Sequence, residues 1–164
     1  MDNHTFRKWN NIVGWLLFGV ALFVYLFTLE HKFSFWDTGE YISSATKLEV
    51  THAPGAALFQ LVGAVMGIFA FGNGQYYGLV INVMSAVFSA FTILFLFWTI
   101  THLVRGIFRK RGGELSVLDD LKVLISGGIG ALAFTFSDTF WYSAVEGEVY
   151  AMASMFIAIL LWLI

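Results

Sequence analysis

The chain is 164 residues long, 59% hydrophobic and only 12% charged, with a formal net charge of −2 and a mean hydropathy of +0.77. Soluble domains carry about a quarter charged residues, so this composition excludes an ordinary soluble protein, and the net charge gives no reason to expect a nucleic-acid partner. The absence of cysteine excludes disulfides, thiolate metal sites and a cysteine nucleophile.

The first predicted membrane span covers residues 9–29, which contain no Asp, Glu, Lys or Arg. At a rise of about 1.5 Å per residue, a helix of this length crosses the roughly 30 Å apolar core of a bilayer. The polar head before it contains Arg7 and Lys8, as a signal peptide would, but the run ends in Phe-Thr-Leu-Glu without a small-residue cleavage site. We therefore expect an uncleaved first helix.

The next apolar stretch runs from Ala53 to Val104 without a charged side chain and is interrupted by turn residues at 71–75. Residues 76–104 are long enough to cross the membrane. Residues 53–71 are compatible either with a span or with a re-entrant or interfacial helix.

Charge bias decides between these two interpretations of residues 53–71. The basic cluster at 105–111 predicts a cytoplasmic loop at 105–120, and the basic residues of 1–8 place the N-terminus on the same side. Two crossings between these segments satisfy both assignments, whereas three do not. We therefore expect residues 53–71 not to cross, within an outside loop at 30–75.

Two more spans are predicted at residues 121–136 and 149–164, with a second outside loop at 137–148. The small residues at 126–131 favour close helix packing over a binding role. The expected fold class is all-α integral membrane, with about four transmembrane helices (the last truncated), a juxtamembrane amphipathic helix, and a re-entrant or interfacial helix in the first outside loop. We expect the N-terminal part of one polytopic domain in a bacterial inner (plasma) membrane, with a cytoplasmic N-terminus.

The first outside loop contains an acidic pair, Asp37 and Glu40, although charge is costly beside a membrane span. Spaced three apart, the two side chains share one face of a helix. One interpretation is a capping box, followed by an amphipathic helix on the membrane with Ile42, Ala45 and Leu48 on its apolar side. The other is catalysis, and the two are compatible because a capping carboxylate can still face a cleft.

Four further residues are candidates for the same site: His52, Glu146, Glu148 and Tyr150. His52 precedes a Pro-Gly turn, and it either belongs only to that turn or donates to a lipid phosphate at the headgroup level. Glu146 and Glu148 are two apart and do not share a helix face, so we expect one to face the site and the other to face water. Tyr150 belongs to an aromatic group that could simply form the interfacial belt.

Several short motifs follow one another along most of the chain after the first span. They are Trp36-Asp37-Thr38-Gly39-Glu40-Tyr41, Leu48-Glu49-Val50, His52-Ala53-Pro54-Gly55-Ala56, Asn82 with Ser85-Ala86, and Glu146-Gly147-Glu148-Val149-Tyr150. This order resembles the GT-C class of polyprenol-dependent membrane glycosyltransferases. It resembles more closely one large bacterial family, long filed as a domain of unknown function, that is related to vertebrate protein O-mannosyltransferases. The sequence departs from that pattern at Ala53 and Ala57, where prolines are expected, so the rigidity of that turn does not carry over.

The resemblance implies transfer of a sugar from a polyprenyl-phosphate-linked donor to a hydroxyl acceptor, a protein Ser or Thr, on the outer face of the membrane. By position it makes Asp37 the general base and Glu40 its neighbour. His52 and Lys47 are candidates for stabilising the leaving lipid phosphate. Glu146, Glu148 and Tyr150 are further candidates for binding the substrate or its lipid phosphate. The pattern does not identify a cofactor with certainty, and a divalent metal on Glu146 and Glu148 is compatible with it.

The implied partners are the lipid-linked donor, a protein or peptide acceptor and the bilayer itself, and we expect this stretch alone to be inactive. The alternatives are a transporter or channel, in which carboxylates lie at mid-bilayer depth, and a non-catalytic membrane subunit. Carboxylates at the outer interface instead favour the transferase.

Overall fold

The computed structural model describes residues 2–31, 36–53, 55–110 and 115–164. Pro54 and Arg111, which belong to the motifs and the basic cluster of the sequence, lie outside these residues. Over the described residues the chain forms seven α-helices and one short 3₁₀ helix, and no strand, which confirms the all-α class. The elements in order are α1 (Asn3–Phe27), α2 (Thr38–Lys47), α3 (Ala57–Gly67), η1 (Ile68–Ala70), α4 (Gly74–Lys110), α5 (Val117–Thr135), α6 (Asp138–Val145) and α7 (Val149–Leu163).

Among the described residues two helices, α1 and α4, are long and apolar enough to cross a membrane. α4 includes the second predicted span, whereas α1 covers the first predicted span only as far as Phe27. α1 has 25 residues and begins where the Asp2 carboxylate accepts a hydrogen bond from the backbone N–H of Thr5, a side-chain N-cap. α4 has 37 residues and carries Arg109 and Lys110 in its last turn, where cations favour the helix dipole.

The later helices differ from the predicted spans. α5 has 19 residues, but Asp119, Asp120 and Lys122 lie in its first two turns, so it is not among the helices apolar enough to cross a membrane. α7 has 15 residues, and together with α6 it forms a pair bent by 114°, which is the geometry of a broken span or a re-entrant loop.

The predicted second outside loop, residues 137–148, contains the helix α6. This segment folds as a helix because Phe140, Ala144 and Val145 fall on one side of it and are buried against the rest of the bundle. Packing therefore gives regular structure to a segment whose polar residues suggested a loop.

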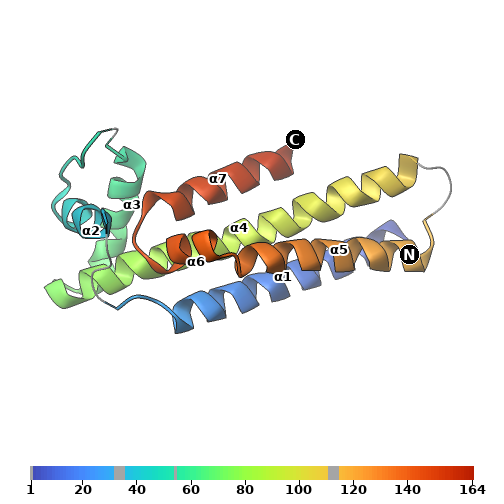
Figure 1. Cartoon of the computed structure of the whole chain (residues 1–164), viewed down its shortest axis with the longest axis horizontal. Helices are drawn as coiled ribbons and strands as arrows, with labels where there is room; N and C mark the ends of the chain where they lie inside the picture. Colours follow the sequence, from blue (N-terminus) through green and yellow to red (C-terminus); the bar gives the residue numbers. More distant parts are fainter. Residues whose placement is uncertain (1, 32–35, 54, 111–114) are drawn as a thin grey trace.

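The long helices run side by side and in alternating directions, as Figure 1 shows: α4 is antiparallel to both α1 and α5. α2, α3, the start of α4 and the corner between α6 and α7 gather at one end of this bundle, which we call the α2 end. The start of α1 and the last turns of α4 lie at the opposite end, which we call the basic end.

The segment from Ala57 to Ala70 stays at the α2 end. α3 has 11 residues, so at about 1.5 Å per residue it is far shorter than the roughly 30 Å apolar core of a bilayer. Gly63 of α3 approaches Ala45 of α2 so closely that a β-carbon there would lie 2.9 Å from the Ala45 side chain. This agrees with the expectation that the segment does not cross, while the sides of the membrane remain a prediction.

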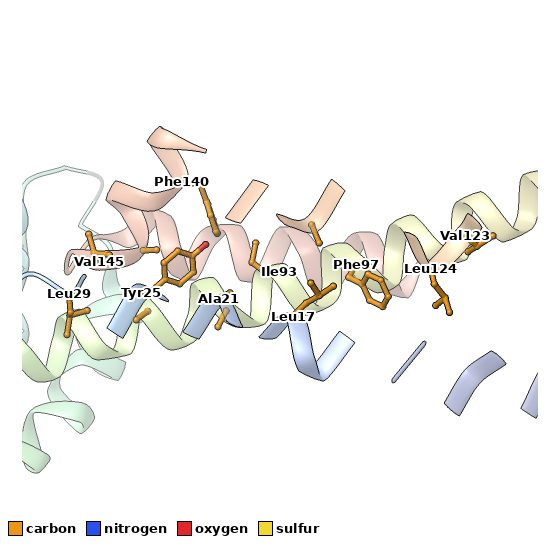
Figure 2. Close-up of a cluster of buried hydrophobic side chains, with 14 of the residues drawn as sticks. Leu17, Ala21, Tyr25, Leu29, Ile93, Phe97, Val123, Leu124, Phe140 and Val145 are labelled. Carbon is orange, nitrogen blue, oxygen red and sulfur yellow. The ribbon is translucent and has the colours of Figure 1, made fainter. Parts of the chain in front are cut away.

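The main core joins α1, α4, α5 and α6 through buried apolar side chains, several of which are drawn in Figure 2. Tyr25 is fully buried in this core, and its hydroxyl donates a hydrogen bond to the Thr135 carbonyl oxygen at 3.0 Å. The small residues of α5 are used for packing, as predicted: a β-carbon at Gly127 would lie 2.6 Å from the Thr101 side chain of α4.

Candidate functional site

Asp37 lies immediately before the first turn of α2, but its side chain makes no capping hydrogen bond. Its backbone lies in the helical region (φ −84°, ψ −3°), whereas an N-cap residue normally has an extended backbone. The predicted capping box of Asp37 and Glu40 is therefore wrong. The reason is that Glu40 is occupied by a residue twelve positions further along the chain.

That residue is His52, and Glu40 binds it through both carboxylate oxygens. The His52 backbone N–H donates to Glu40 Oε1 at 2.7 Å, and His52 Nδ1 lies 2.9 Å from Glu40 Oε2. The His52 ring also packs at a tilt beside Tyr41, with the two ring centroids 6.0 Å apart. The loop after α2 is thereby tied back to the first turn of the helix, and the imidazole has a fixed orientation.

These contacts shift both pKa values in the direction that charges the pair. The pKa of Glu40 is lowered, first by the hydrogen bond from the His52 backbone N–H and then by the one from its side chain. The pKa of His52 is raised, mainly by its side-chain hydrogen bond to Glu40 and further by the negative charges of Glu40 and Asp37. An imidazolium between carboxylates is therefore favoured beyond the pH at which an isolated histidine loses its proton.

The second imidazole nitrogen faces Asp37, since His52 Nε2 lies 3.8 Å from Asp37 Oδ2. One ligand atom each from Asp37, Glu40 and His52 lie within 4.8 Å of one another. Carboxylate oxygens and an imidazole nitrogen are a donor set that divalent transition metals accept. If a metal takes part, these three residues offer converging atoms, whereas the sequence had favoured Glu146 and Glu148.

Glu148 approaches α2 from the corner between α6 and α7. The Thr38 hydroxyl, which is fully buried, donates to Glu148 Oε1 at 3.4 Å. Burial raises the pKa of the Glu148 carboxyl, and the charges of Glu146 and Asp37 raise it further. The raised pKa means that Glu148 keeps its proton to a higher pH than an isolated glutamic acid does.

The α6–α7 corner reaches this position because residue 147 is glycine. A β-carbon at Gly147 would lie 2.9 Å from Asn82 Oδ1 and 3.0 Å from the Ile81 side chain, both on α4. Asn82 is fully buried and donates from Nδ2 to the backbone carbonyl of Glu30 at 2.7 Å. The Glu30 backbone N–H in turn donates to the Val145 carbonyl at 3.2 Å. Asn82 and Gly147 therefore join the end of α1, the start of α4 and the corner.

Asp37, Glu146, Glu148 and Tyr150 share one cavity of about 720 Å³. Both glutamates line it, whereas the sequence predicted that only one of them would face the site. Tyr150 lines it from the first turn of α7 and is 60% exposed. The wall is completed by polar and aromatic residues of the α5–α6 region: Phe134, Ser137, Asp138, Thr139, Phe140, Tyr142 and Ser143, with Ser154 of α7.

Lys47 is not brought into this group. It is the last residue of α2, at the opposite end of that helix from Asp37, and it is exposed. No lysine or arginine is among the described residues that line the cavity. His52 does not line the cavity either, but its ring lies 3.8 Å from the carboxylate of Asp37, which does.

Most of the lining residues were not among the sequence candidates for the site, and two of them, Trp36 and Asp138, are neighbours of the motifs or carry a carboxylate. Trp36 is 91% exposed and has a positive φ of 64°, a conformation that is unusual for a bulky residue. Its place next to Asp37 in the first motif was the signal that could have found it. Asp138 belongs to the segment predicted as the second outside loop, but it is the first residue of α6, after the N-cap residue Ser137, and it lines the cavity.

The fold and the site together define a class: a membrane-associated helical protein with an acidic cavity beside the end of its long apolar helices. Residues 37–164 match the family described as the protein O-mannosyl-transferase TMEM260 N-terminal domain. The chain belongs to this family.

Two curated relatives carry the same description in their names. The protein O-mannosyl-transferase TMEM260 of Mus musculus is 29% identical over 147 residues, which is 88% of this chain and 18% of the relative. The protein O-mannosyl-transferase tmem260 of Dictyostelium discoideum is 28% identical over 148 residues, which is 90% of this chain and 16% of the relative. The chain thus spans less than a fifth of the length of either relative. No solved structure matches it.

Proposed function

We propose that the protein to which this chain belongs is a membrane glycosyltransferase that moves a mannosyl group from a polyprenyl-phosphate donor to a serine or threonine hydroxyl of a protein. The transferase class and the sugar come from the names of the relatives. The lipid carrier and the catalytic role of Asp37 are supported by the position and chemistry of the cavity.

The observation that carries this proposal is the cavity itself, in which Asp37 of the α2 region meets Glu146 and Glu148 of the α6–α7 corner. It lies at the α2 end, beside the ends of the two helices that can cross a membrane. A donor anchored by its lipid tail would present its phosphate and sugar at this depth. The cavity has both aromatic and acidic lining, which suits a sugar and a hydroxyl acceptor.

Asp37 is proposed as the general base. As the acceptor oxygen attacks the anomeric carbon, its proton passes to the Asp37 carboxylate, and the bond from that carbon to the lipid phosphate breaks with its electron pair on the phosphate oxygen. The Asp37 side chain is 56% exposed and has no helix-capping bond, so an acceptor hydroxyl can approach it.

His52 and Glu40 are proposed to prepare Asp37. Glu40 holds the imidazole by two hydrogen bonds, and the Nε2 side of the ring faces the Asp37 carboxylate at 3.8 Å. A charged imidazole at this place lies against the Asp37 carboxylate and offers a cation close to the leaving phosphate. Lys47 is withdrawn from this role because it lies at the far end of α2.

The transporter alternative receives less support from the structure. Residues 9–29 and 53–104 contain no charged side chain, so α1 and the apolar part of α4 provide no carboxylate at mid-depth. The carboxylates of the site instead belong to the α2 region and the α6–α7 corner, at one end of the bundle.

The proposal is tested with the whole protein, purified and supplied with an acceptor protein and one of two donors. With polyprenyl-phosphate mannose, mass spectrometry should detect one added hexose on serine or threonine, whereas GDP-mannose alone should give none. Equal transfer from the soluble nucleotide donor would refute the lipid-linked step, and no transfer from either donor would refute the mannosyltransferase assignment.

A further inference from the structure

A second cavity, of about 840 Å³, lies at the basic end of the bundle. It is formed between the first turns of α1 and the last turns of α4, with one residue of α7. Its lining combines basic side chains with two tryptophans: Arg7, His102, Arg105, Arg109, Trp98 and Trp162. None of the described residues that line it is acidic.

Within the described residues, the charge of this cavity is only partly neutralised. Arg105 is neutralised, since its Nε lies 2.9 Å from the buried Asp120 carboxylate of α5 and its guanidinium covers the Phe6 ring. Arg109 binds only a neutral partner, the Asn3 side-chain oxygen at 2.7 Å. Neither Arg7 nor Arg109 forms an ion pair with any described residue. Two exposed guanidinium groups and three asparagine side chains therefore face the cavity as hydrogen-bond donors.

An aromatic run leads from this basic cavity along the apolar part of the bundle. The Trp98 ring contacts both Trp162 of α7 and Trp15 of α1, with centroids 5.6 Å and 6.3 Å apart, and Phe95 continues the run beside Trp162 at 5.4 Å. Trp15 and Trp162 are 51% and 43% exposed. An apolar surface thus begins where the cationic one ends, and both face the outside of the described bundle.

We propose that this cavity binds the phosphate headgroup of an anionic membrane phospholipid, with an acyl chain lying along the aromatic run. Arg7 and Arg109 pair with the phosphate, and the asparagine amides complete its hydrogen bonds. Basic cavities between membrane helices recognise anionic headgroups in this way. A free phosphate would satisfy the arginines equally well but would leave the aromatic run without a role, so the lipid is the ligand that fits the whole surface.

The test compares two double variants of the whole protein that remove the same charge. Arg7→Gln/Arg109→Gln changes the two arginines of the cavity that form no ion pair with a described residue. The matched control, Lys8→Gln/Lys110→Gln, changes two exposed lysines one position further along the same helices, which do not line the cavity. Arg105 is left unchanged because its buried partner Asp120 would lose its counter-charge.

The measurement is native mass spectrometry of delipidated protein titrated with phosphatidylglycerol or with phosphatidylcholine of the same acyl chains. The unchanged protein should prefer phosphatidylglycerol. The arginine double variant should lose roughly tenfold to thirtyfold of that preference, since each basic side chain near an anionic headgroup contributes about fivefold. The lysine control should keep the preference for phosphatidylglycerol. Arg7→Gln or Arg109→Gln alone should lose about fivefold of it, so the single variants test the proposal if the double variant does not fold.

Three results would overturn the proposal. An equal loss in both double variants would show general surface attraction, and no loss in either would show that the arginines do not bind the lipid. Displacement of phosphatidylglycerol by inorganic phosphate at an equal concentration would assign the cavity to a soluble phosphate. Because this cavity and the acidic one lie at opposite ends of the bundle, each of these results is independent of the transferase test.

Discussion

At the scale of single residues, the site depends on which partner the Glu40 carboxylate binds, the N-terminus of its own helix or His52. Its spacing from Asp37 would allow a capping box, but the carboxylate binds the backbone N–H and the ring of His52 instead. A local hydrogen bond within the first turn of α2 is thereby exchanged for one that ties the following loop to the helix. The Asp37 side chain is left without a helix-capping bond and faces the His52 ring.

Replacing Glu40 by glutamine should lower the pKa of His52. Glutamine keeps an acceptor oxygen but removes the negative charge, which is part of what raises the pKa of the imidazole. Titration of the His52 ring by NMR should give a midpoint above about 6.5, the ordinary histidine value, and Glu40→Gln should move it towards that value. A His52→Asn variant identifies the signal. An unchanged midpoint would show that the pair seen in the structure does not form in solution.

The same pair gives stability a defined dependence on pH. Folding raises the pKa of His52, so its contribution is complete below about pH 6.5 and is lost as pH rises through the raised value. Folding lowers the pKa of Glu40, so its contribution is complete above about pH 4.3 and is lost as pH falls through the lowered value. The stability difference between the unchanged protein and Glu40→Gln, measured by thermal melting, should be largest between these two limits. A difference that does not vary with pH would contradict the ion pair.

Replacing Gly147 by alanine should displace the α6–α7 corner. The new methyl group would meet Asn82 Oδ1 at 2.9 Å and the Ile81 side chain at 3.0 Å, and overpacking of this kind costs about 1–3 kcal/mol. We expect a lower melting temperature together with weaker transfer, because Glu146 and Glu148 would move with the corner. Gly128→Ala is the matched control, since a β-carbon there meets nothing within 4 Å. Equal melting temperatures for the two variants would contradict the tight contact.

At the scale of the elements, the sequence predicts the long helices better than the short ones. α1 and α4 were predicted from long uncharged runs, and few structures other than a membrane-spanning helix fit such runs. α6 was missed because Asp138 and the aromatic residues of that segment suggested an interfacial loop. Ala144 and Val145 lie about one helical turn after Phe140, which is a spacing typical of a helix. This spacing was present in the sequence, but it predicts a helix only once the rest of the core is known to bury these residues.

In the candidate site, too, the sequence predicted the residues that belong to short motifs but not the contacts between distant parts of the chain. Asp37, Glu146, Glu148 and Tyr150 could be selected from motifs, and the structure brings all four to one cavity. Their partners could not be selected, because Thr38 and Glu148 are 110 positions apart and Glu40 and His52 are 12 apart. Sequence spacing identifies only residues that are neighbours on one helix. It therefore predicted a helix cap at Glu40, whereas the structure has hydrogen bonds between Glu40 and His52 of the following loop.

The placement of α3 at the α2 end can be tested by cysteine labelling, because the chain has no cysteine of its own. Cysteines at Ser43 and Gly74, on either side of α3, should react with an impermeant thiol reagent from the same face of the membrane. A cysteine at Lys110, at the end of α4, should react from the opposite face. Labelling of Ser43 and Gly74 from opposite faces would show that the segment between them crosses.

At the scale of the whole molecule, charge is sorted between the two ends of one bundle. The acidic cavity lies at the α2 end and the arginine-lined one at the basic end, with uncharged helix between them. Cytoplasmic loops of membrane proteins are enriched in lysine and arginine, so this sorting would orient the bundle with the acidic cavity outside. The proposed transfer reaction and the proposed lipid contact then occupy opposite surfaces of the same membrane.

The central claim, that Asp37 is the general base of a transferase, is tested most directly by Asp37→Asn in the whole protein. Because Asp37 makes no capping bond, asparagine should leave the melting temperature unchanged. Transfer from the polyprenyl-phosphate donor should nevertheless fall by roughly 10²- to 10⁴-fold, the usual contribution of a general base. Glu49→Gln, which removes an exposed carboxylate that does not line the cavity, should retain transfer. Full activity of Asp37→Asn at equal folding would contradict the account.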